Sequence, residues 1–97
     1  MRRAAKRDHS EPEIIAALKN LGCSVEQLSG EDIPDLLVGY RGVNFLFEVK
    51  TGSAALTEGQ RKWHEGWMGL PVALVRCPMD ALDAINFTWA PAPKRSA

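Results

Sequence analysis

Three residues in two neighbouring segments of the chain have the types and spacing of a metal site that acts on phosphate esters. Asp35 follows Pro34, and Glu48 and Lys50 stand two residues apart at the end of a β-rich run. Successive side chains of a strand point to opposite faces, so Glu48 and Lys50 would share one face. Carboxylates are ligands that Mg²⁺ and Mn²⁺ prefer, and such an ion activates water for phosphodiester hydrolysis. The Lys50 ammonium would orient the attacking water or stabilise the transition state.

A β-hairpin would bring the two carboxylates together. Segments 36–40 and 43–50 are rich in β-branched and aromatic residues, and the residues 41–42 between them, Arg-Gly, predict a tight turn. If residues 41 and 42 form a two-residue loop, the residue numbers of each cross-strand pair add up to 83, so Asp35 would face Glu48. Their Cβ atoms would lie roughly 5 Å apart, which is unfavourable for two like charges unless a cation intervenes.

A structural salt bridge is the alternative interpretation of this group. Lys50 would then pair with Glu48 or Asp35, as is common on half-exposed sheet faces. The acidic pair lies at the end of the hairpin distant from its turn, beside Leu37 and Leu46, where an idle charge cluster would be costly. This location favours a metal site.

Two residues of predicted helices are further candidates. Glu11 precedes apolar residues by three, four and seven positions, which places its carboxylate on the core-facing stripe of a helix. There it would be an outer ligand or hold a water, unless it only complements the helix dipole. Gln60 closes a capping box that begins at Thr57, so it is a cap, a site residue, or both in turn.

In this order, the motifs resemble those of the PD-(D/E)xK nuclease superfamily, and more narrowly the small stand-alone VRR-NUC-type nucleases of phages and bacteria. The similarity covers residues 7 to about 85: a helix with a glutamate, then IPDLLVG, FLFEVK, LTEGQRKWHEGW and PVALVR. It implies an α/β fold with a restriction-endonuclease-like αβββαβ core, a mixed sheet flanked by helices, and metal-dependent phosphodiester hydrolysis. The matching positions are Asp35, Glu48 and Lys50 as catalytic residues, Glu11 and Gln60 as accessory residues, and the backbone carbonyl of Val49 as a further metal ligand.

The remaining pattern predicts the elements that position these residues. A first helix begins with a capping box of Ser10 and Glu13 and ends at Leu21, before Gly22. A short strand follows over residues 23–28.

A second helix carries Trp63 and Trp67 on one face and stops at Gly69, and a strand over 72–75 and a helix over 78–85 complete the order. Ala81, Leu82 and Ile85 would face inward from that last helix. The two tryptophans are more typical of core or dimer contacts than of a base-stacking platform.

Composition predicts one small globular domain. The 97 residues carry twelve Lys and Arg against twelve Asp and Glu, and no apolar run approaches the roughly 20 residues of a membrane span. Without a signal peptide or a glycine-rich phosphate loop, we expect a cytoplasmic protein with no organic cofactor. Cys23 and Cys77 would be buried small hydrophobes. We divide the chain into a basic flexible arm (1–9), the domain (10–89) and a flexible tail (90–97).

DNA, duplex or branched, is the expected partner, and a homodimer is the expected assembly. The first ten residues carry a charge of +3, although such an arm is as well explained by a solvated terminus. One domain of this size has a small DNA footprint, which pairing would enlarge. His64 is expected to be solvated, and His9 has no catalytic role. Candidate DNA contacts are Arg2, Arg3, Lys6, Arg7, Arg41, Arg61 and Lys62, with Tyr40 and Arg76 as further candidates.

The function expected from these observations is a Mg²⁺- or Mn²⁺-dependent DNA endonuclease, selective for branched or junction DNA. The competing hypothesis is a non-catalytic DNA-binding or partner-docking module that retains the fold, with a purely structural acidic face. A metal titration separates the two, because only the enzyme should gain stability with the ion.

Overall fold

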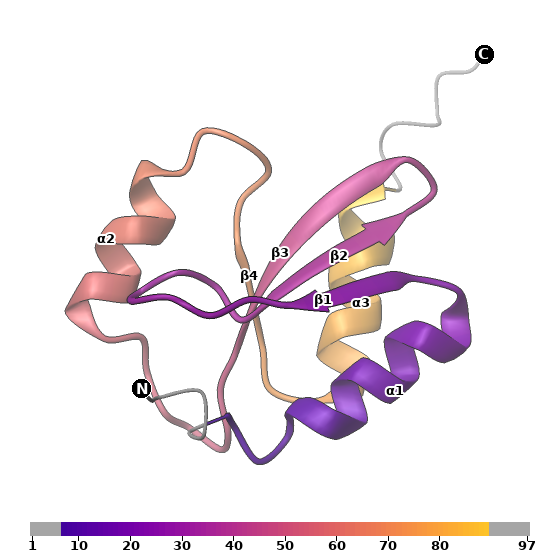
Figure 1. Ribbon diagram of the computed structural model, residues 1–97, viewed down its shortest axis with the longest axis horizontal. Coiled ribbons are helices and arrows are strands. Elements are labelled where there is room, and N and C mark those ends of the chain that lie inside the picture. Colours follow the sequence, from indigo (N-terminus) through magenta and orange to yellow (C-terminus); the bar gives the residue numbers. More distant parts are fainter. Residues whose placement is uncertain (1–6, 90–97) are drawn as a thin grey trace.

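The chain alternates helices and strands in the order helix, three strands, helix, strand, helix (Figure 1). The computed structural model describes residues 7–89, so the predicted tail and most of the predicted arm lie outside the described residues. The fold is α/β, as the sequence predicts. The elements are α1 (Glu11–Leu21), β1 (Ser24–Gln27), β2 (Leu36–Tyr40), β3 (Val43–Val49), α2 (Glu58–Gly66), β4 (Ala73–Val75) and α3 (Pro78–Trp89).

The four strands form one mixed sheet in the order β1-β2-β3-β4. Strand β2 is antiparallel to both β1 and β3, whereas β4 runs parallel to β3. Parallel neighbours need a crossover connection, and α2 lies in that connection. The β2-β3 turn has Arg41 at φ 52° and Gly42 at φ 81°, the two positive angles of a type I′ hairpin. The predicted register is confirmed, since Tyr40 pairs with Val43 and Leu37 with Leu46.

The hydrophobic core lies on one side of the sheet, under α1 and α3, which contact each other. Phe45, Phe47 and Val49 of β3 point into this core, so the alternate residues Leu46 and Glu48 point to the other side. In Figure 1, α2 stands apart from the pair formed by α1 and α3. Side chains on the second face of the sheet can therefore contact residues of α2.

The predicted capping box of the first helix does not form. Ser10 has helical angles, φ −83° and ψ −8°, instead of the extended conformation of most N-cap residues, and makes no cap hydrogen bond. The backbone already turns before the helix, because the N–H of Glu11 donates to the carbonyl of Asp8 at 3.1 Å. Among the described residues, the buried hydroxyl of Ser10 has no hydrogen-bond partner.

Three other local predictions need correction. Helix α2 ends at Gly66, not at Gly69, and Trp67 follows it in an extended conformation. Helix α3 continues past residue 85 to Trp89. Cys23 is buried as expected, but Cys77 is exposed. None of the described helices is long and apolar enough to cross a membrane.

Candidate active site

The carboxyl groups of Asp35 and Glu48 meet at the end of the β2-β3 hairpin. The N–H of Asp35 donates to the carbonyl of Phe47 at 3.0 Å, although the register partner of Phe47 is Leu36, so the pairing at Asp35 departs by one residue from the register of β2 and β3. The Oδ2 atom of Asp35 accepts a hydrogen bond from the N–H of Val49 at 2.8 Å. The two carboxyl groups lie close enough for Asp35 to raise the pKa of Glu48. The structure thus brings together the pair that the register predicts.

Glu48 is buried, with 1% of its surface exposed. Burial, then the hydrogen bond with Asp35 and the charge of Asp35, raise the pKa of Glu48 from 4.5 to about 9. The charge of Lys50 acts in the opposite direction, and the charge of Asp8 adds to the rise. The raised pKa favours the form of Glu48 that keeps its proton beside the Asp35 carboxylate. A cation that replaced this proton would lie between two oxygen ligands.

Gln60 serves as a cap and as a site residue at the same time. Its N–H donates to the hydroxyl of Thr57 at 3.1 Å, and its side-chain oxygen accepts from the N–H of Thr57 at 2.9 Å. Its Nε2 donates to Oε2 of Glu48 at 3.2 Å. Because the cap fixes the amide oxygen, the amide nitrogen is directed at Glu48. The structure therefore confirms the cap, and it also brings Gln60 to the candidate site residue Glu48.

His64 also contacts Glu48, so the expectation of a solvated histidine is wrong. Its Nε2 lies 3.1 Å from Oε1 of Glu48, and its side chain is 12% exposed. Burial and the charge of Lys50 lower the pKa of His64, and the charge of Asp35 opposes them. The sequence contains one signal for this contact, since His64 follows Gln60 by four residues and shares its helix face.

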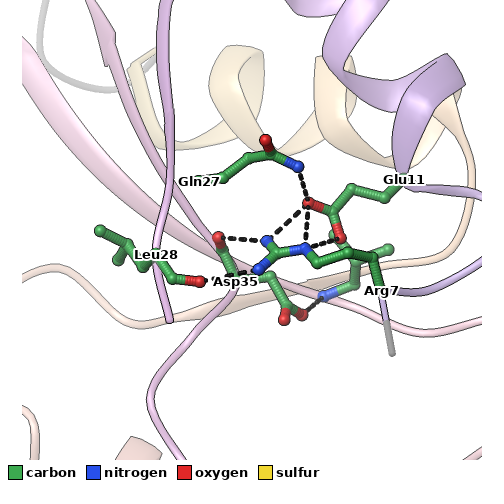
Figure 2. Close-up of polar contacts among 6 residues, drawn as sticks. Arg7, Glu11, Gln27, Leu28 and Asp35 are labelled. Carbon is green, nitrogen blue, oxygen red and sulfur yellow. Dashed lines mark hydrogen bonds and ion pairs between the residues drawn. The ribbon is translucent and has the colours of Figure 1, made fainter. Parts of the chain in front are cut away.

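Glu11 lies in a second polar cluster, which Figure 2 shows. It is 1% exposed, in agreement with its place on the apolar stripe of α1. Arg7 donates to its carboxylate with Nη2 at 2.7 Å and with Nε at 3.2 and 3.3 Å, and Gln27 donates at 2.9 Å. The same guanidinium donates to the carbonyls of Leu28 at 3.0 Å and Asp35 at 3.2 Å. The cluster therefore ties the start of α1 to the backbone of Asp35.

The expected third acidic ligand is not brought to the pair. Within residues 7–89, no three His, Cys, Asp or Glu side chains gather in a group that could hold a metal ion. Glu11, expected as an outer ligand, is instead bound by Arg7, which was expected to contact DNA phosphates. Two carboxylates still fit Mg²⁺ or Mn²⁺, because such ions commonly take one or two carboxylates and complete their shell with water and substrate oxygens.

Lys50 and Asp8 are the remaining charged groups near Glu48. Lys50 is half-buried, directly after β3, and its charge lowers the pKa of both Glu48 and His64. Asp8 accepts a hydrogen bond from the Thr51 hydroxyl at 3.0 Å. No motif or spacing signals Asp8, because it precedes the first helix and approaches the site only through the fold.

Some of the predicted DNA-contacting side chains bind partners within the protein, and others are exposed. Arg61 pairs with Glu58 and Glu65 along α2, and Arg76 donates to two backbone carbonyls, at 2.7 and 2.8 Å. Arg41 lies over the ring of Tyr40 at 5.2 Å, and Lys62 is exposed. Arg2, Arg3 and Lys6 lie outside the described residues.

An apolar groove of about 420 Å³ has in its lining Pro34, the residue before Asp35. One wall includes Trp63 of α2 and Trp67, which directly follows α2, and their rings stack with centroids 4.9 Å apart. Its floor includes Leu37 and Leu46 from the same sheet face as Glu48. The two tryptophans therefore line a groove at the surface, and Trp67 is 45% exposed.

Comparisons of the chain with family models, curated proteins and solved structures found no match.

Proposed function

We propose that the protein is a Mg²⁺- or Mn²⁺-dependent nuclease that hydrolyses phosphodiester bonds of DNA. The observation that carries the proposal is the buried carboxyl group of Glu48 beside Asp35, where burial together with Asp35 raises the pKa of Glu48 to about 9. An acidic pair in which one member has a strongly raised pKa is typical of functional sites, because two like charges in contact are otherwise unfavourable. A divalent cation would satisfy both carboxylates and take the place of the proton of Glu48.

In this proposal, Asp35 and Glu48 hold the ion, and the backbone carbonyl of Val49 is a further ligand. The ion would lower the pKa of a bound water and neutralise charge on the phosphate. Lys50 supplies the positive charge that orients the attacking water. Gln60 fixes the Glu48 carboxyl group. Glu11 acts indirectly, by holding the Arg7 guanidinium against the carbonyl of Asp35.

The resemblance to the PD-(D/E)xK superfamily supports the same function. The αβββαβ order that it implies is the order of the elements from α1 to β4, with α3 added at the end. Its acidic motifs fall at the start of β2 and the end of β3, and its glutamine falls on the first turn of α2. A restriction-endonuclease-like core is therefore part of the proposal.

We further propose branched or junction DNA as the substrate and a homodimer as the active form. Three exposed apolar side chains follow one another closely after α2, at Trp67, Met68 and Leu70. Contiguous apolar surface of this kind is typical of protein interfaces. Sedimentation of a monomer at micromolar concentration, both free and on DNA, would contradict the dimer.

Cleavage assays with labelled DNA test the nuclease directly. Wild type and Lys50→Ala are incubated with Mg²⁺, Mn²⁺ or EDTA on duplex, single-stranded, flap and four-way-junction DNA. We expect metal-dependent cleavage by the wild type, strongest on a branched substrate, and none by Lys50→Ala. Lys19→Ala is the matched control, because it removes an exposed lysine of α1 that is not among the candidate DNA contacts. Binding without cleavage, equal in EDTA, would favour the non-catalytic DNA-binding or docking module instead.

A further inference from the structure

Gln60 and His64 hold the two oxygens of Glu48 from one face of α2. The two residues are four positions apart, so their side chains lie one turn above the other. The Nε2 of Gln60 is 3.2 Å from Oε2, and the Nε2 of His64 is 3.1 Å from Oε1. With one contact on each oxygen, the plane of the carboxyl group is fixed.

The imidazole of His64 is itself held by its surroundings. Its ring meets the ring of Trp63 edge to face, with centroids 6.5 Å apart and an interplanar angle of 83°. Trp63 is braced in turn by stacking on Trp67. An ionised carboxylate only accepts hydrogen bonds, so Nε2 of His64 must carry a proton whenever Glu48 is ionised. The contact therefore fixes the orientation of the ring, and it also selects the Nε2–H tautomer once Glu48 is ionised.

We infer that His64 is a positioning residue that orients the Glu48 carboxylate for a divalent cation. The inference rests on the proposed function, and it assigns a role that the motif of Asp35, Glu48 and Lys50 does not include. His64 acts through Glu48 and does not bind the ion, because its Nε2 is directed at Oε1. Hydrogen bonds to a ligating carboxylate keep it in the geometry that the ion requires, and their loss typically costs about 10- to 100-fold in metal affinity.

Calorimetric titration with Mn²⁺, without DNA, tests this role. His64→Leu removes the donor and keeps an apolar side chain against Trp63, and we expect it to weaken Mn²⁺ binding about 10- to 100-fold. His64→Gln should restore most of the affinity, because its amide N–H stands the same number of bonds from the backbone as Nε2. His9→Ala, at the exposed second histidine, should bind as the wild type does. Thermal unfolding without metal checks that each variant is folded.

The possible outcomes separate this role from the metal site itself. If Asp35→Asn abolishes Mn²⁺ binding but His64→Leu binds like the wild type, the role of His64 is refuted and the metal site stands. Weakening in His64→Leu that His64→Gln does not reverse would assign the loss to packing, and would also refute the role. A wild type that binds no Mn²⁺, and so matches Asp35→Asn, would refute the proposed function together with this inference.

Discussion

Glu48→Gln is expected to remove most of the pH dependence of stability of the metal-free protein above pH 7. The folded state raises the pKa of Glu48 from 4.5 to about 9, so between these values it binds one proton more than the unfolded state. Stability due to this proton is complete below pH 4.5 and is lost as the pH rises toward 9. A proton difference of one changes the free energy of unfolding by about 1.4 kcal/mol per pH unit.

The useful range for this experiment is pH 7 to 8.5. Below pH 7, the lowered pKa of His64 has the opposite effect, since its neutral folded form loses stability as the pH falls through 6.5. Over pH 7 to 8.5, we expect the wild type to lose about 2 kcal/mol. In Glu48→Gln, the amide replaces the neutral acid and keeps a donor for Asp35, so this loss should be nearly absent.

Urea denaturation in EDTA at pH 7, 7.5, 8 and 8.5 gives the free energy of unfolding of each protein. The decisive quantity is the slope of this free energy against pH, compared between the wild type and Glu48→Gln. Equal slopes would refute the reasoning, because they would show that Glu48 is ionised in the folded protein at neutral pH. In saturating Mg²⁺, the wild type should lose the downward trend, since the ion would replace the proton. Glu48→Gln should gain no stability from Mg²⁺.

Two further predictions concern the elements that hold the site. Arg7→Ala should lower the free energy of unfolding by about 3 kcal/mol, because it leaves the carboxylate of Glu11 buried without its ion-pair partner. Urea denaturation measures this loss, and Arg41→Ala on the hairpin turn is the control. A loss as small as that of the control would show that the ion pair of Arg7 and Glu11 does not stabilise the fold. Thr57→Ala should lower the free energy of unfolding by about 1 kcal/mol, because α2 loses its N-terminal cap. It should also weaken Mn²⁺ binding, because Gln60 loses its fixed orientation. An unchanged Mn²⁺ affinity in this variant would contradict the link between the cap and the site.

Much of the fold could be predicted from the sequence because its rules are local. The alternation of the 36–40 and 43–50 segments, with Arg-Gly between them, specifies the hairpin and its register within a few residues. The capping box from Thr57 to Gln60 likewise depends on four consecutive residues. Even so, the same rule failed at Ser10, where an earlier backbone turn changed the conformation on which a cap depends.

The sequence by itself determined the register of β2 against β3, because strand pairing allows few registers and the turn selects one, and this register ends beside Asp35 and Glu48. Only the tertiary structure decided which groups surround them. His64 reaches Glu48 because the crossover connection places α2 beside β3, and Arg7 binds Glu11 because the chain before α1 folds back toward Leu28 and Asp35. These partners are 4 to 28 residues apart. Contacts between elements depend on how several packed layers fit together, which no spacing along one element specifies.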